Sequence, residues 1–134
     1  MKARGLSAAL LLFCAGCAEP AAGPDNPPSV GSIDVPKARA SVSSQFVVSG
    51  WAADESGVAE LRLYLDDKLV ATPSLTVVRP DVDRAYPTAL REPHGFSTVV
   101  NAGDKTDRCL IRAEVLDKRG ALSRVAQVSV VIEP

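Results

Sequence analysis

The chain has 134 residues, of which 46% are hydrophobic and 23% are charged, and its formal net charge is −1. This length suits one domain rather than several. The near balance of charge argues against a nucleic-acid partner, which requires a clustered basic face.

The first sixteen residues have the layout of an export signal. Lys2 and Arg4 precede an apolar run from Leu6 to Phe13, and small residues then surround Cys17. A basic start, a short apolar run and small residues at a cleavage site are typical of signal peptides. A bilayer span needs about 20 apolar residues, so the run is too short for a membrane anchor. We therefore predict a signal peptide over residues 1–16.

The segment Ala15-Gly16-Cys17 resembles a bacterial lipobox, although Cys14 stands where leucine is usual. The resemblance implies cleavage before Cys17, acylation of its thiol and attachment to the membrane through this N-terminal lipid. Ala18 follows in place of aspartate, which implies the outer membrane, on either its periplasmic or its outer side. The alternative is an ordinary cut near Ala18 that releases a secreted protein.

Cleavage after residue 16 changes the charge and the cysteine content. Two of the 15 basic residues leave with the signal, so 13 remain against 16 acidic ones and the net charge becomes −3. This balance argues against electrostatic docking to anionic lipid. If Cys17 carries lipid, Cys109 is the remaining cysteine of the mature chain, so an internal disulfide is excluded.

A change of composition divides the mature chain at residue 30. Residues 17–29 are rich in Pro, Ala and Gly and predict a disordered tether. Residues 30–134 contain short β-branched runs separated by turn residues, which is typical of an all-β domain. The predicted strands are Val30 to Val35, Gln45 to Ala53, Ala59 to Leu65, Leu69 to Ala71, Leu75 to Val78, Phe96 to Val100, Cys109 to Leu116 and Val125 to Ile132. Residues 79–95 are predicted to form a long polar loop.

Alternation within these runs predicts which faces are buried. Leu61, Leu63 and Leu65 alternate with polar residues, and Cys109 shares one side of its strand with further apolar residues. Successive side chains of a strand point to opposite faces, so these sets are predicted to face a core. About seven antiparallel strands in this length suit an immunoglobulin-like β-sandwich.

Several motifs in residues 30–134 resemble those of bacterial Ig-like domains. They are Gly50-Trp51-Ala52-Ala53-Asp54, Ser56-Gly57-Val58, the strand ending at Asp66, Arg79-Pro80-Asp81-Val82, Tyr86-Pro87, Gly95-Phe96 and Asp117-Lys118-Arg119-Gly120. The chain departs from that pattern at Asp67-Lys68, where Asp-Gly is common, and in the length between Phe96 and Cys109. The resemblance implies a fold and not an activity, because one fold hosts many functions.

Two Asp-x-x-Gly motifs, at Asp54 and Asp117, follow predicted strands. Oxygen ligands suit calcium, but the acidic spacing of an EF-hand is absent. We favour turns in which the carboxylate accepts backbone N–H bonds.

Four residues are candidates for ligand binding: Trp51, Tyr64, Arg79 and Asp81. Trp51 and Tyr64 fall opposite the predicted inner faces and would stack on a sugar if exposed, whereas a crossing loop, residues 79–87, would cover Trp51. Arg79 and Asp81 line a loop that carries either a ligand rim or internal ion pairs.

No catalytic, metal or cofactor site is predicted. His94, the single histidine, is predicted to be structural. A triad requires a positioned base, which one loop histidine does not indicate, and a metal site needs more soft or imidazole ligands than this chain offers. We therefore predict a non-enzymatic envelope lipoprotein whose Ig-like module serves interaction or structural spacing. The alternative is a carbohydrate- or peptide-binding module that uses residues 79–95 and Trp51. Envelope proteins or cell-wall glycans are the expected partners.

Overall fold

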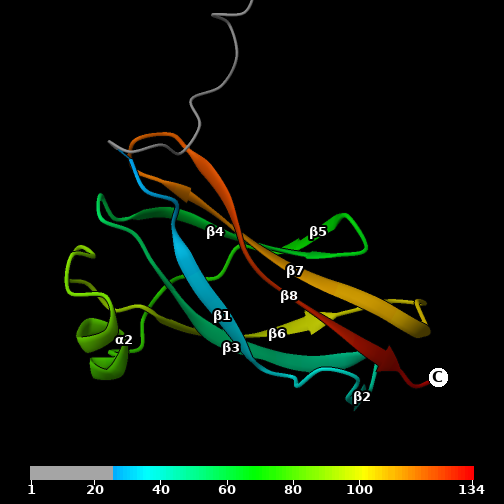
Figure 1. Ribbon diagram of the computed structural model, residues 1–134. Coiled ribbons are helices and arrows are strands. Elements are labelled where there is room, and N and C mark those ends of the chain that lie inside the picture. Colours follow the sequence, from blue (N-terminus) through cyan, green and yellow to red (C-terminus); the bar gives the residue numbers. More distant parts are fainter. Residues whose placement is uncertain (1–25) are drawn as a thin grey trace, which may run out of the picture.

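The computed structural model describes residues 26–134, which form two packed β-sheets (Figure 1). One sheet has three strands in the order β1-β3-β6, and the other has five in the order β2-β8-β7-β4-β5. The elements are β1 (Val30–Val35), β2 (Ser41–Val42), β3 (Gln45–Ala53), β4 (Val58–Leu65), β5 (Lys68–Ala71), α2 (Pro80–Ala85), β6 (Gly95–Asn101), β7 (Asp107–Asp117) and β8 (Leu122–Ile132). This is the predicted all-β, immunoglobulin-like sandwich.

The alternation seen in the sequence sets the register of the central strands. β4 and β7 run antiparallel and place Leu63 directly opposite Ala113. β3 and β6 pair without a bulge over seven residues, with Val48 opposite Thr98. Because side chains alternate along each strand, one register buries every second residue of both partners.

The core lies between the two sheets and takes side chains from both. It comprises Phe46, Val48, Ala52, Leu61, Leu63, Leu65, Phe96, Val100, Cys109, Ile111, Ala113, Val115, Val130 and Ile132. The predicted inner faces of β4 and β7 are thus confirmed. Cys109 is 1% exposed and is a free thiol, so apolar packing holds the sheets together.

Three local features differ from the prediction. Leu75 to Val78 is wrong as a strand, because Val77 makes only one isolated bridge, to Gly95. The six-residue helix α2 lies within the predicted loop and begins at Pro80, and it is too short to show a helical period. β2 has two residues and runs parallel to β8, so one strand pair is not antiparallel.

The sandwich has two distinct ends. We call the end formed by residues 54–57 and 117–121 the proximal end, because β1 begins there, and the opposite end, formed by residues 66–67 and 102–106, the distal end (Figure 1). The C-terminus lies at the distal end. Of the helices within residues 26–134, none has the length and apolarity to cross a membrane.

Candidate functional site

The two Asp-x-x-Gly motifs form turns at the proximal end, as the sequence predicts. The Asp54 carboxylate accepts bonds from the backbone N–H of Ser56 at 2.8 Å and from its hydroxyl at 2.6 Å. The Asp117 carboxylate accepts the backbone N–H groups of Arg119 and Ala121, both at 2.9 Å. Both aspartates are buried, so their oxygens serve the protein's own donors.

Each of these aspartates also binds the segment that leads into β1. The Ser29 hydroxyl donates to Asp54 at 2.7 Å, and the Asn26 side-chain amide donates to Asp117 at 3.2 Å. The Arg119 guanidinium donates in turn to the side-chain amide oxygen (Oδ1) of Asn26 at 3.3 Å. Residues 26–29, predicted to belong to the tether, are therefore fixed to the proximal end. The predicted lipidation residue Cys17 and the rest of the tether lie outside the described residues.

Burial and hydrogen bonding act in opposite directions on Asp117. Burial raises the pKa of its carboxyl, but the bonds from Ala121, Asn26, Arg119 and Gly120 favour the charged form and outweigh burial, so the pKa is lowered. The carboxylate is thus stabilised as an anion by donors that the fold supplies. Within residues 26–134, no group of three or more His, Cys, Asp or Glu side chains is placed to hold a metal ion.

Arg79 and Asp81 pair with each other at the start of α2. The Arg79 guanidinium donates to both carboxylate oxygens of Asp81, at 3.0 and 2.9 Å, and lies 3.3 Å from Asp34 of β1. These bonds lower the pKa of Asp81 to about 2 and raise that of Arg79. The structure therefore brings two of the four candidate residues, Arg79 and Asp81, together as an ion pair within the chain.

Trp51 and Tyr64 lie in different sheets, so they do not form one stacking platform. The Trp51 ring packs on Tyr86, with ring centroids 5.5 Å apart. Tyr86 belongs to residues 79–87, the loop predicted from the sequence to cover Trp51. The Arg112 guanidinium lies 4.5 Å from the centre of the Tyr64 ring, a cation–π arrangement. Each of the two rings therefore has one neighbouring side chain packed against it.

His94 is fully buried and joins α2 to the sheet. Its Nδ1 lies 3.2 Å from the carbonyl oxygen of Ala52, and its Nε2 lies 3.1 Å from a carboxylate oxygen of Asp83. Both partners are acceptors, so both bonds form together only when both ring nitrogens carry hydrogen. His94 is thus hydrogen-bonded on both ring nitrogens within the fold, and its link to β3 escapes sequence reasoning because Ala52 lies 42 positions away.

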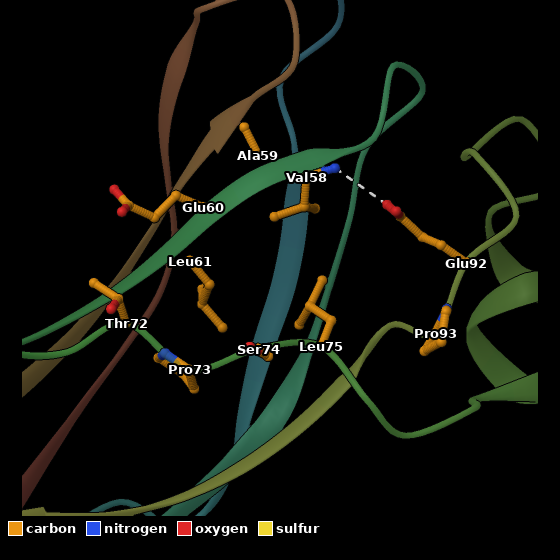
Figure 2. Close-up of a pocket in the computed structure, with 10 residues that line it drawn as sticks. All are labelled: Val58, Ala59, Glu60, Leu61, Thr72, Pro73, Ser74, Leu75, Glu92 and Pro93. Carbon is orange, nitrogen blue, oxygen red and sulfur yellow. Dashed lines mark hydrogen bonds between the residues drawn. The ribbon is translucent and has the colours of Figure 1, made fainter.

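A groove of about 370 Å³ opens beside the first half of β4 (Figure 2). Leu61 and Leu75 point into it, and the Glu92 carboxylate reaches across to accept the Val58 N–H at 3.1 Å. Glu60 points away and pairs with Arg62 at 2.6 Å. The two carboxylates therefore do not face each other across the groove, whereas the carboxylate pair of a glycosidase flanks the bond that is cleaved.

The thiol of Cys109 is not arranged as a nucleophile. Burial, followed by the nearby charge of Asp66, raises its pKa to about 11. A nucleophilic cysteine needs the opposite shift, because the thiolate is the reactive form. The position of Cys109 in the core is therefore that of a small apolar side chain.

Comparison with known proteins supports the fold. Neither the family models nor the curated proteins give a match to this chain. Among solved structures, the chain resembles the fibronectin(III)-like modules of CbhA from Clostridium thermocellum, with a TM-score of 0.53 and 12% identity over 78% of this chain and 96% of that one. CopC from Methylosinus trichosporium OB3b aligns over 78% of this chain and 94% of its own, with 13% identity and a TM-score of 0.42, too low to carry an argument. Identities this low show the sandwich fold alone.

Proposed function

We propose that this chain is a non-enzymatic envelope lipoprotein whose single Ig-like module serves as a spacer or interaction module held by a lipid on Cys17. The observation that carries the proposal is the fixed attachment of residues 26–29 at the proximal end, with the C-terminus at the distal end. A pull on the tether would therefore reach the sandwich through the bonds of Ser29 and Asn26 to the buried carboxylates of Asp54 and Asp117. Residues 17–25 span at most about 30 Å when extended, so the proximal end would face the membrane.

The chemistry of the described residues agrees with a module that performs no catalysis. The buried titratable groups Asp54, Asp117 and His94 are each bonded within the fold. A general base must reach a nucleophile, and His94 instead has partners on both ring nitrogens. The fibronectin(III)-like likeness adds support at the level of the fold.

The carbohydrate- or peptide-binding alternative receives less support. It needs an open aromatic face, whereas Trp51 packs on Tyr86 and Arg112 covers Tyr64. Tryptophan fluorescence separates the two proposals, because Trp51 is the single tryptophan. A spectral shift on titration with cell-wall glycans would favour the binding module, and an unchanged spectrum favours the spacer.

The lipid anchor is tested with the two neighbouring cysteines. The full chain is expressed in a bacterial host, and its membrane fraction and mature N-terminus are analysed by mass spectrometry. We expect an acylated Cys17 in the wild type, a soluble Cys17→Ala variant and a Cys14→Ala variant that stays with the membrane. An unmodified N-terminus near Ala18 or Glu19 in the wild type would overturn the anchor and make the protein secreted.

A further inference from the structure

The four outer strands of the two sheets differ in how they are protected. β1 carries Asp34, has an irregularity between Ile33 and Val35, and is followed by Pro36. β2 has only two residues, and β5 has four, with a shifted register against β4. Short length, charge, proline and bulges are the usual means by which an edge strand avoids pairing with another chain.

β6 has none of these protections. Its seven residues, Gly95–Asn101, include no charge and no proline, and they pair with β3 in an unbroken register. Val99 is 63% exposed and lies opposite Val47, which is 46% exposed. The edge is therefore long, regular and uncharged, with an exposed valine at its centre, and such an edge can recruit another strand.

The hydrogen-bond pattern shows which backbone groups of β6 face outward. Ala52 donates to the carbonyl of His94 at 2.9 Å, and Ala102 donates to Ser44 at 2.7 Å. Bonded pairs alternate along an antiparallel ladder, so the even-numbered residues of β6 face β3. The N–H and C=O groups of Ser97, Val99 and Asn101 consequently point away from the sheet.

Gly95 shows that this edge accepts an antiparallel partner. Its N–H donates to Val77 at 2.8 Å, and its carbonyl accepts the Val77 N–H at 3.0 Å. Continuing that register would place Pro73 opposite Val99. Proline has no N–H to donate, and the chain instead leaves toward β5, which approaches β6 but belongs to the other sheet and does not pair with it. Among the described residues, the backbone groups of β6 beyond Gly95 that point away from β3 therefore have no strand partner.

We propose that the open part of β6 pairs with β6 of a second copy of this chain, antiparallel about a two-fold axis at Val99. In this register Ser97 faces Asn101 of the second copy, and the two Val99 residues face each other. All three outward residues then find partners, and the most exposed part of the edge is buried. An isologous contact of this kind closes on itself and gives a dimer.

A second copy fits this edge better than a charged or unstructured peptide. The edge is uncharged, so it offers no ion pair to a charged partner. A β6 strand is already ordered in its own sheet, so its pairing avoids the entropy that a free peptide would lose on ordering. The contact is one strand wide and small, and we therefore expect a weak, concentration-dependent dimer.

The first test is sedimentation of the full chain over a wide range of concentration. We expect a monomer–dimer equilibrium for the wild type. Val99→Lys should weaken it at least about tenfold, because two like charges would face each other at the axis. Val47→Lys is the matched control: it adds the same charge on the same outer face, one strand away, and should dimerise as the wild type does.

The second test traps the contact through a disulfide. The Cα atoms of a bonded antiparallel pair lie about 5.5 Å apart, which is within disulfide range. Val99→Cys should therefore give cross-linked dimer under mild oxidation, well above the wild type and above Leu69→Cys on the β5 edge. A wild type that stays monomeric with no excess cross-linking at residue 99 would overturn the proposal, and so would equal cross-linking at residues 69 and 99.

Discussion

At the proximal end of the sandwich, Asp54 and Asp117 are 3% and 2% exposed and accept bonds from backbone amides and from residues 26–29. At the distal end, Asp66 and Asp67 are exposed and pair with Lys105 at 2.8 Å and Arg112 at 2.6 Å. Aspartate residues thus occur at both ends of the sandwich, buried at the proximal end and exposed at the distal end. A buried donor that loses its acceptor cannot turn to water, whereas an exposed cation can. The proximal turns should therefore control stability far more than the distal ones.

The largest effect is expected from Asp117→Ala. This change leaves the N–H groups of Arg119 and Ala121 without their acceptor, and Ala121 is 1% exposed. We expect the free energy of unfolding to fall by about 3 kcal/mol in urea titrations. Asp104→Ala removes the same charge from an exposed distal loop and should change little. Equal losses of unfolding free energy in the two variants would contradict the view that the proximal turns control stability more than the distal ones.

Asp117→Ala should also change how the free energy of unfolding depends on pH. The folded pKa of Asp117 is lowered, so its contribution is complete above the usual value of 3.8 and is lost as the pH falls through the lowered value. As the pH falls below 3.8, the free energy of unfolding should therefore decrease more in the wild type than in Asp117→Ala. Parallel curves for the two proteins would show that Asp117 is not the titrating group.

A smaller effect is expected from His94→Gln. A glutamine amide has a single nitrogen that donates, so it replaces at most one of the two bonds to Ala52 and Asp83. We expect a loss of about 2 kcal/mol, together with a change in Trp51 fluorescence as α2 and Tyr86 loosen. Arg84→Gln, on the exposed side of the same helix, should leave both unchanged. Wild-type fluorescence in His94→Gln would show that other contacts hold α2.

Ser29→Ala should have a smaller effect again, about 1 kcal/mol, because Asp54 keeps both of its bonds from Ser56. The distal control is Ser43→Ala, whose exposed hydroxyl donates to the Gln45 carbonyl at 2.6 Å. Thermal unfolding of the two variants compares a buried with an exposed hydroxyl bond. A larger loss in Ser43→Ala would reverse the order that burial predicts.

The sequence predicts the sheets better than it predicts the contacts of the proximal end. Alternation in β4 and β7 is visible because every second residue faces the core over many positions. The bond between Asn26 and Asp117 joins residues 91 positions apart, and the composition around Asn26 resembles a linker. For Arg79 and Asp81 the sequence leaves a ligand rim and an ion pair open, and the structure shows the ion pair between these two residues, which are two positions apart. Local patterns can be read from one chain, whereas long-range polar pairs need the fold.

The smallest effect is expected from Lys105→Ala at the distal end. Lys105 and its partner Asp66 have side chains that are 39% and 38% exposed, so water and salt screen their attraction. Asp66 also keeps its bond from the Leu110 N–H at 2.9 Å. We therefore expect an unfolding temperature equal to that of the wild type within error, at low and at high salt. Asp66→Ala, which loses the backbone bond as well, should be less stable than Lys105→Ala. A Lys105→Ala variant less stable than Asp66→Ala would show that the ion pair, and not the bond from the Leu110 N–H, holds the distal turn. Solvent exposure would then not explain the difference in stability between the two ends.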